Sequence, residues 1–158
     1  MKIATTRPFA GFRPIRCLAL ALTLALTACT SVTYISEYDE GLDRGVTAVQ
    51  VATESFFTQL EHTGRPPSPT LSKDEQAFLD QVAVALTVLQ TRAAALPKNE
   101  ITSAQLALLK DSFSTLGELL KAGAPRDQVQ TIRNAFNAST GAILKLELAK
   151  KRGGPPAA

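Results

Sequence analysis

Residues 72–97 read SKDEQAFLDQVAVALTVLQTRAAALP and decide the fold. Ser72 and Glu75 have the spacing of a capping box, in which each side chain binds a backbone N–H at the start of a helix. Apolar residues then recur at intervals of three and four, which places them on one face of a helix. This face consists of Leu79, Val82, Leu86, Leu89, Ala93 and Leu96. Pro97 cannot continue the helix, so the sequence predicts an amphipathic helix that ends there.

Three further segments repeat this spacing of apolar residues. The first runs from about Ser36 to His62, and its stripe is Leu42, Val46, Val49, Thr53, Phe56 and Leu60. The next follows a second capping-box pattern at Thr102–Gln105, and its stripe is Leu106, Leu109, Phe113, Leu116 and Leu120. The last begins near Pro125, and its stripe is Val129, Ile132, Phe136, Ser139, Ile143 and Leu146. Each predicted helix therefore has one apolar face for a shared core.

The connections between the predicted helices contain helix-breaking residues. Pro66-Pro67-Ser68-Pro69 interrupts the first connection, and Gly123 suits the left-handed position that follows a helix. Four helices joined by short connections predict an all-α fold, an antiparallel up-down-up-down four-helix bundle over residues 36–150. We expect residues 151–158 to be a disordered tail. Because the same pattern suits coiled coils, an elongated oligomer is the alternative.

The first 28 residues have the layout of a secretory signal peptide. The leader carries four basic residues, Lys2, Arg7, Arg13 and Arg16. An apolar segment of eleven residues, 18–28, follows this leader and ends in small residues. It is too short for a membrane-spanning helix, which needs about 20 apolar residues. We therefore predict that residues 1–28 are a cleaved signal peptide and not a buried helix.

Leu26-Thr27-Ala28-Cys29 resembles the lipobox of bacterial lipoproteins. The resemblance implies cleavage before Cys29 and acylation of its sulfur and amino group with chains such as palmitate. Residues 29–35 would then form a lipidated tether. Because Thr30 and not aspartate follows the cysteine, the resemblance implies the periplasmic face of the outer membrane, or the outer surface in a host with one membrane. Cys17 is not favoured as the lipidated residue, because no apolar run precedes it.

Removal of the signal peptide changes the charge of the chain. It takes away four of the 17 basic residues and none of the 14 acidic ones, which leaves a net charge of −1. We therefore expect no nucleic-acid partner, since such partners need a basic surface. His62 is the only histidine, and Cys29 is the only cysteine that remains. With no catalytic motif in view, we expect no internal disulfide, no metal centre, no cofactor and no enzymatic activity.

Two helices carry apolar residues outside their core stripes. In the helix that ends at Pro97, Val84 and Val88 fall on the side away from the core. In the next helix, Leu108 and Leu119 belong to a fainter second stripe that also includes Ile101, Ala104 and Thr115. A helix that is apolar all round suggests that a partner covers its outer face. We predict a partner-binding surface at Val84, Val88, Leu108 and Leu119, although scattered exposed apolar residues are also common.

Other features have an ordinary interpretation and a functional alternative. The proline segment is a rigid turn or a polyproline ligand. His62 is an exposed or capping residue or a pH-sensitive contact. Four acidic residues that crowd the first helix complement its dipole or bind a cation: Glu37, Asp39, Glu40 and Asp43. Four basic residues that end the last helix complement its dipole or contact anionic headgroups: Lys145, Lys150, Lys151 and Arg152.

These features together predict a non-enzymatic lipoprotein anchored to a membrane. Its expected role is that of a helical accessory or scaffolding subunit in a bacterial cell-envelope assembly. Its expected partners are the membrane, through the lipid, and another envelope protein or a second copy of the chain. The alternative is a periplasmic binding module, such as an inhibitor, an immunity-type lipoprotein or a chaperone, which would use the proline segment or a groove between helices.

Overall fold

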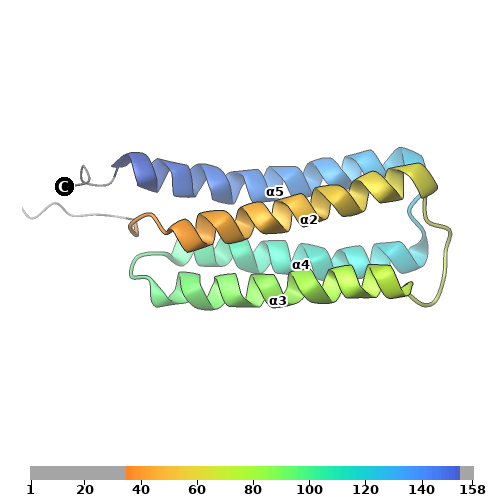
Figure 1. Ribbon diagram of the computed structural model, residues 1–158, viewed down its shortest axis with the longest axis horizontal. Helices are drawn as coiled ribbons and strands as arrows, with labels where there is room; N and C mark the ends of the chain where they lie inside the picture. Colours follow the sequence, from red (N-terminus) through yellow and green to blue (C-terminus); the bar gives the residue numbers. More distant parts are fainter. Residues whose placement is uncertain (1–34, 154–158) are drawn as a thin grey trace, which may run out of the picture. The chain divides into compact units, whose positions relative to one another are not determined.

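The computed structural model describes residues 35–153, which form four α-helices (Figure 1). The helices are α2 (Glu40–Thr63), α3 (Lys73–Ala95), α4 (Glu100–Ala122) and α5 (Arg126–Gly153). Within this range the only β pairing is an isolated bridge between Arg65 and Ala124. The predicted all-α fold is therefore confirmed.

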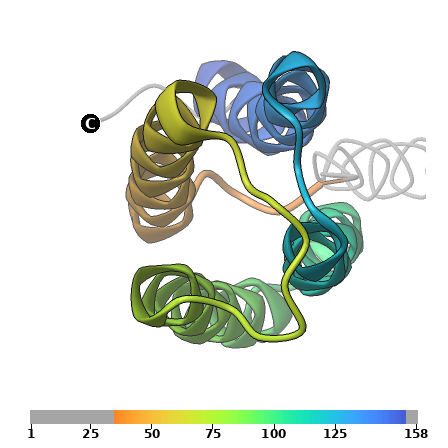
Figure 2. The same cartoon turned by 90° about the vertical axis from the view of Figure 1, so that its right-hand side faces the viewer.

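Consecutive helices run in opposite directions, and each packs against the next (Figure 1). α5 closes the arrangement by packing against α2, and helices on opposite corners do not contact each other. The pairs α2–α5 and α3–α4 share more contacts than α2–α3 and α4–α5. Figure 2, a view along the helices, shows these two pairs as two layers. This arrangement is the predicted up-down-up-down bundle.

The core is built from the apolar stripes of all four helices. In α4 all the predicted stripe residues are buried, among them Leu106 and Leu120. In α3 Leu86 and its neighbours on the stripe are buried, but Leu79 and Leu96 are only partly buried against the core. In α2 the prediction of Phe56 is wrong, because Phe57 occupies the buried position. Phe56 instead stacks on Phe78 of α3 with ring centroids 4.2 Å apart, at the edge of the core.

The predicted stripe of α5 is also wrong in part. Ser139 is exposed, and Thr140 takes the buried position one residue later. In both helices two successive buried residues lie four positions apart where the prediction placed them three apart: Thr53 and Phe57 in α2, and Phe136 and Thr140 in α5. An α-helix has 3.6 residues per turn, so a strict alternation of three and four drifts off the buried face.

The predicted start of one helix agrees with the structure, and the predicted starts of two others differ from it. The capping box of α3 is present: Glu75 N donates to Ser72 Oγ at 3.2 Å, and Ser72 N donates to Glu75 Oε2 at 2.7 Å. α2 begins at Glu40, four residues later than expected, because the Asp39 carboxylate caps it. The second predicted capping box is wrong, because α4 begins at Glu100 and Thr102 lies inside it.

The proline segment packs against the connection between α4 and α5. Arg65 and Ala124 exchange two backbone hydrogen bonds, of 3.0 and 2.8 Å. Ser68 N donates to Lys121 O at 2.9 Å. Gly123 has φ 100°, and an added Cβ there would lie 3.0 Å from the Pro67 ring. The segment is thus held as a turn that joins both connections at this end of the bundle.

The described range also bears on the predicted domain boundaries. α5 continues to Gly153, three residues past the predicted end of the bundle. The predicted signal peptide, Cys29 and Cys17 lie outside the described residues, as do residues 154–158. Among the described helices, none combines the length and the apolar character needed to cross a membrane.

Candidate functional site

All four predicted partner-binding residues lie on the surface of the bundle. Val84 and Val88 of α3 expose 67% and 62% of their area, and Leu108 and Leu119 of α4 expose 68% and 41%. Ile101, which belongs to the same side of α4, is exposed as well. Exposure of large apolar side chains in groups is typical of interaction surfaces.

The four residues do not form one surface, although sequence reasoning had grouped them. Lys110 Nζ donates to Thr87 Oγ1 at 3.1 Å, which marks the seam between α4 and α3. Leu108 and Leu119 lie about 200° and 180° around α4 from Lys110, at about 100° per residue. They therefore face away from α3, on the α5 side. We call Ile101, Leu108 and Leu119 the α4 patch.

Val84 and Val88 belong to the other side of the bundle. Val88 lies about 40° around α3 from Arg92, whose Nε donates to Asp39 before α2 at 2.6 Å. The two valines therefore lie between the outward direction of α3 and the side that faces α2. We call Val84 and Val88 the α3 patch. The α3 patch and the α4 patch therefore lie on different sides of the bundle.

A pocket of about 400 Å³ opens between α2 and α3, and the sequence did not reveal it. The stacked rings of Phe56 and Phe78 are part of its lining, together with polar side chains such as Gln59 and Gln81. Its lining contains no histidine, lysine or cysteine. Such a surface suits a small or extended ligand. The hydroxyl of Ser72 and the carboxylate of Glu75, which meet in its lining, are engaged in the capping box of α3.

A buried polar cluster lies where the chain enters the bundle. Lys150 exposes only 4% of its area. Its Nζ donates to Glu147 Oε1 at 2.5 Å, to Asn99 Oδ1 at 2.7 Å and to Thr102 Oγ1 at 2.8 Å. Ser36 Oγ also donates to Asn99 Oδ1, at 2.8 Å. The cluster therefore joins the segment before α2 to the ends of α4 and α5.

This cluster corrects the prediction for Lys150, which cannot contact lipid headgroups while it is buried. Lys145, Lys151 and Arg152 are exposed. The sequence alone did not show that Lys150 is buried, although Glu147 and Lys150 continue the spacing of Thr140 and Ile143, which the structure shows to be buried. Charged residues on a core stripe require partners. Glu147 and Lys150 bind each other, and further partners come from Asn99 and Thr102 at the start of α4.

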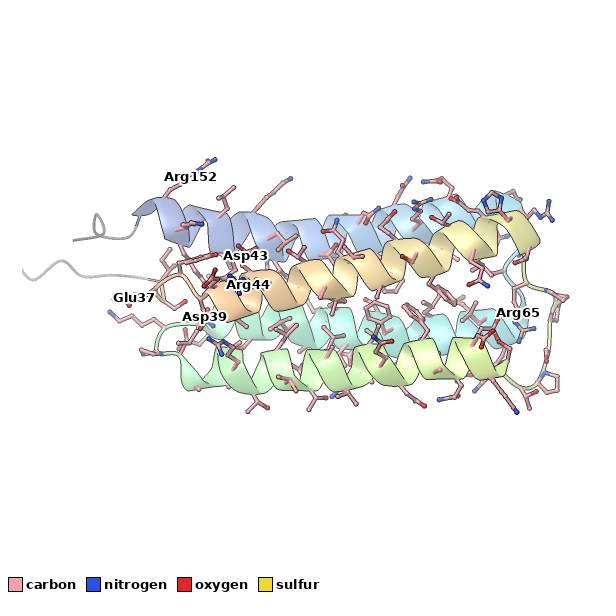
Figure 3. All side chains as sticks on the ribbon, in the orientation of Figure 1. Glu37, Asp39, Asp43, Arg44, Arg65 and Arg152 are labelled. Atoms are coloured by element: carbon pink, nitrogen blue, oxygen red, sulfur yellow. The ribbon has the colours of Figure 1, made fainter. Side chains whose placement is uncertain are left out.

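Three of the four acidic residues near α2, namely Asp39, Glu40 and Asp43, are engaged by neighbouring groups. Glu37, Asp39, Asp43 and Arg44 gather at the end where α2 begins (Figure 3). Asp39 accepts from Leu42 N and Arg92 Nε, and the hydrogen bond from Arg92 lowers the pKa of this carboxyl. Tyr38 donates to Asp43 at 2.8 Å, which raises the pKa of Tyr38 to about 12. This arrangement fits the dipole interpretation.

Ion pairs hold the opposite end of the bundle. Arg133 of α5 binds Glu54 and Glu61 of α2, and its hydrogen bonds lower the pKa of Glu54. Arg65 Nε lies 2.6 Å from Glu75 Oε1 and ties the proline segment to α3. The nearby His62 is exposed. In the part of the chain that the structure describes, no acidic, histidine or cysteine side chains cluster in a way that could hold a metal ion.

Comparisons with known proteins do not assign this chain to a family. No family model, no curated protein and no solved structure matches it.

Proposed function

We propose that this protein is a lipid-anchored, non-enzymatic helical subunit of a bacterial cell-envelope assembly, where it acts as an accessory or scaffolding component. The α4 patch is the observation that carries the scaffolding role. Ile101, Leu108 and Leu119 expose apolar side chains on one side of α4 over 18 residues, or about 27 Å. A protein partner that covers this row would remove it from water.

The lipobox resemblance at Cys29 supports membrane attachment, and the position of Ser36 indicates which end of the bundle would lie near the membrane. Ser36 N donates to Lys98 O at 2.9 Å, so the chain joins the bundle beside the α3–α4 connection. The six residues between Cys29 and Ser36 span at most about 20 Å. The end of the bundle that contains Ser36 would therefore stay close to the bilayer. A partner of the α4 patch would have to reach this level, which favours another envelope protein.

We expect Cys29→Ala to abolish lipidation and membrane attachment. The variant should accumulate as an unprocessed precursor or be recovered in the soluble fraction. The measurement is membrane fractionation with a mass spectrum of the N-terminal peptide, and Cys17→Ala is the matched control. Membrane retention of a cleaved Cys29→Ala protein would contradict the anchor.

The partner surface is tested by crosslinking in intact cells, affinity purification and mass spectrometry. We expect the wild type to capture an envelope protein, and we expect Leu108→Asp to reduce this capture strongly because it places a charge in the apolar contact. Val51→Asp is the matched control, since Val51 is an exposed valine on α2, outside both patches. Equal capture by Leu108→Asp and wild type would contradict the assignment of the α4 patch.

The pocket between α2 and α3 supports a second candidate function, the periplasmic binding module. Its volume of about 400 Å³ and its mixed lining suit a ligand that fills the space beside Phe56 and Phe78. In that case crosslinking should capture a soluble ligand and no envelope protein, and Phe78→Ala, but not Leu108→Asp, should abolish that capture.

A further inference from the structure

The outer face of α3 carries a row of side chains whose charges are arranged symmetrically. Asp80, Val84, Val88 and Arg92 follow one another at four-residue intervals, and all four are exposed. The acidic and basic residues stand at the two ends of the row, and the α3 patch forms its centre. Asp80 lies four residues before Val84, and Arg92 lies four residues after Val88.

A row with this arrangement of charges is complementary to an identical row that runs in the opposite direction. If a second α3 runs antiparallel with a two-fold axis at the level of Leu86, Val84 meets Val88 of the second copy. In the same register Asp80 meets Arg92 of the second copy, and the symmetry repeats both pairs. A contact that is self-complementary in this way is the requirement for an isologous dimer. We infer that the α3 patch binds a second copy of this chain in this antiparallel register.

The neighbouring row on α3 provides room for this contact. It consists of small exposed residues, Ala83, Thr87, Thr91 and Ala95. Helices pack when the i, i+4 ridge of one lies in the groove beside the ridge of the other. The ridges of the two copies then run alongside each other, so their oppositely charged ends meet even when the helix axes cross. The small row forms the groove that receives the valines, and the ammonium group of Lys110, which binds Thr87 Oγ1, borders this groove on the α4 side.

Asp80 and Arg92 can each form a contact with a second copy in addition to the hydrogen bonds that they make within the chain. Arg92 Nε donates to Asp39, but the side chain is half-exposed and a guanidinium has five N–H donors. Asp80 Oδ1 accepts from Gln76 Nε2 at 2.8 Å, which leaves its second carboxylate oxygen for the partner. The exposed side chains of α2 beside this face are uncharged, namely Ala48, Ser55 and Gln59. On the α4 side two lysines approach the row, but both have partners. Lys121, which lines a surface hollow together with Asp80, binds Glu118 Oε1 at 2.9 Å, and Lys110 binds Thr87 Oγ1 at 3.1 Å. The ion pairs between Asp80 and Arg92 therefore determine the register.

The inference refines the proposed function, because it assigns the α3 patch to a second copy and leaves the α4 patch to another envelope protein. An interface with one helix per copy is at the small end of specific interfaces, so its affinity is modest. Two copies anchored in one bilayer meet at a higher effective concentration. The antiparallel register also places the two Ser36 ends at opposite ends of the dimer, which requires both bundles to lie along the membrane.

Disulfide crosslinking of the full-length chain tests the register. Differently tagged Val84→Cys and Val88→Cys chains are expressed in one cell and oxidised. A disulfide needs Cα atoms within about 7 Å, which the facing pair of positions 84 and 88 satisfies. Two cysteines at position 84 would be displaced by about 6 Å along the helix in addition to the separation of the axes. We expect the mixed 84–88 product to exceed both single-site products, and a predominance of single-site products would overturn the register.

Charge reversal tests the end contacts with the same readout, starting from the 84–88 cysteine pair. Asp80→Arg should lower the yield of the mixed product about tenfold, because it replaces two ion pairs with two like-charge contacts. Asp80→Asn should lower the yield less, because it removes the ion pairs without creating like-charge contacts. Asp111→Arg on α4 is the matched control and should leave the yield unchanged. An unchanged yield with Asp80→Arg would overturn the proposal.

Different results distinguish the dimer through the α3 patch from the proposed function through the α4 patch. Loss of self-crosslinking with Asp80→Arg, together with unaltered capture of another protein, supports the dimer alone. Loss of envelope-protein capture with Leu108→Asp, without any self-crosslinking in the wild type, supports the proposed function and overturns the dimer. Capture of a different protein at Val84, lost with Asp80→Arg, would also overturn it.

Discussion

Replacing Lys150 with methionine is expected to destabilise the bundle by about 3–5 kcal/mol. The substitution keeps the length and the apolar stem of the side chain, but it removes the ammonium group that donates to Glu147, Asn99 and Thr102. Glu147 has no exposed area, and its Oε2 already lacks a partner. Without Lys150, a buried carboxylate would have no cation beside it. Chemical denaturation of the purified protein measures the loss.

The matched control is Lys145→Met, which changes an exposed lysine of the same helix and should alter stability by less than about 0.5 kcal/mol. The double variant Glu147→Leu with Lys150→Met should recover most of the loss, since replacing both members of a buried pair with apolar residues is often neutral or stabilising. A loss below about 1 kcal/mol for Lys150→Met would show that the buried carboxylate does not depend on Lys150, and that the pair is not a closed unit.

Leu86→Asp is expected to unfold the protein. Leu86 is fully buried at the centre of α3, so the substitution removes a core side chain and places an unpaired carboxylate among apolar neighbours. Loss of a core leucine alone commonly costs about 2–5 kcal/mol, and domains of this kind have only about 5–15 kcal/mol of stability. Circular dichroism should show loss of the helical signal.

Val84→Asp is the matched control for this experiment, because it introduces the same side chain two residues away on the same helix. Val84 is two-thirds exposed, so the variant should remain helical and melt as one cooperative unit. Unfolding of both variants would mean that the outer face of α3 belongs to a core, and the α3 patch would no longer be a partner surface.

The spacing of apolar residues was sufficient to predict α3 and α4. In α4, for example, Leu106, Phe113 and Leu120 are all buried as expected. The capping box at Ser72 placed the start of α3 correctly because both of its hydrogen bonds are local. The same pattern at Thr102 was misleading, because the Thr102 hydroxyl binds Glu147 and Lys150 of α5 and does not cap α4.

The errors in α2 and α5 have a different cause. Phe56 and Phe57 are both apolar, and Ser139 and Thr140 are both small hydroxyl residues, so composition does not choose between neighbours. The choice depends on the rotation of each helix against the next. An added Cβ at Gly45 would lie 2.4 Å from Leu89, which shows how closely α2 approaches α3. Such contacts between helices set the rotation.

The sequence by itself determined the four helices, their order and the two sets of apolar residues outside the core. These properties depend on residues within a few positions of one another, and local periodicity and helix-breaking residues encode them. Only the tertiary structure decided that Lys150 is buried and that the α3 and α4 patches lie on different sides of the bundle. Both facts depend on which helix packs beside which, and that choice is made by contacts between residues far apart in the chain.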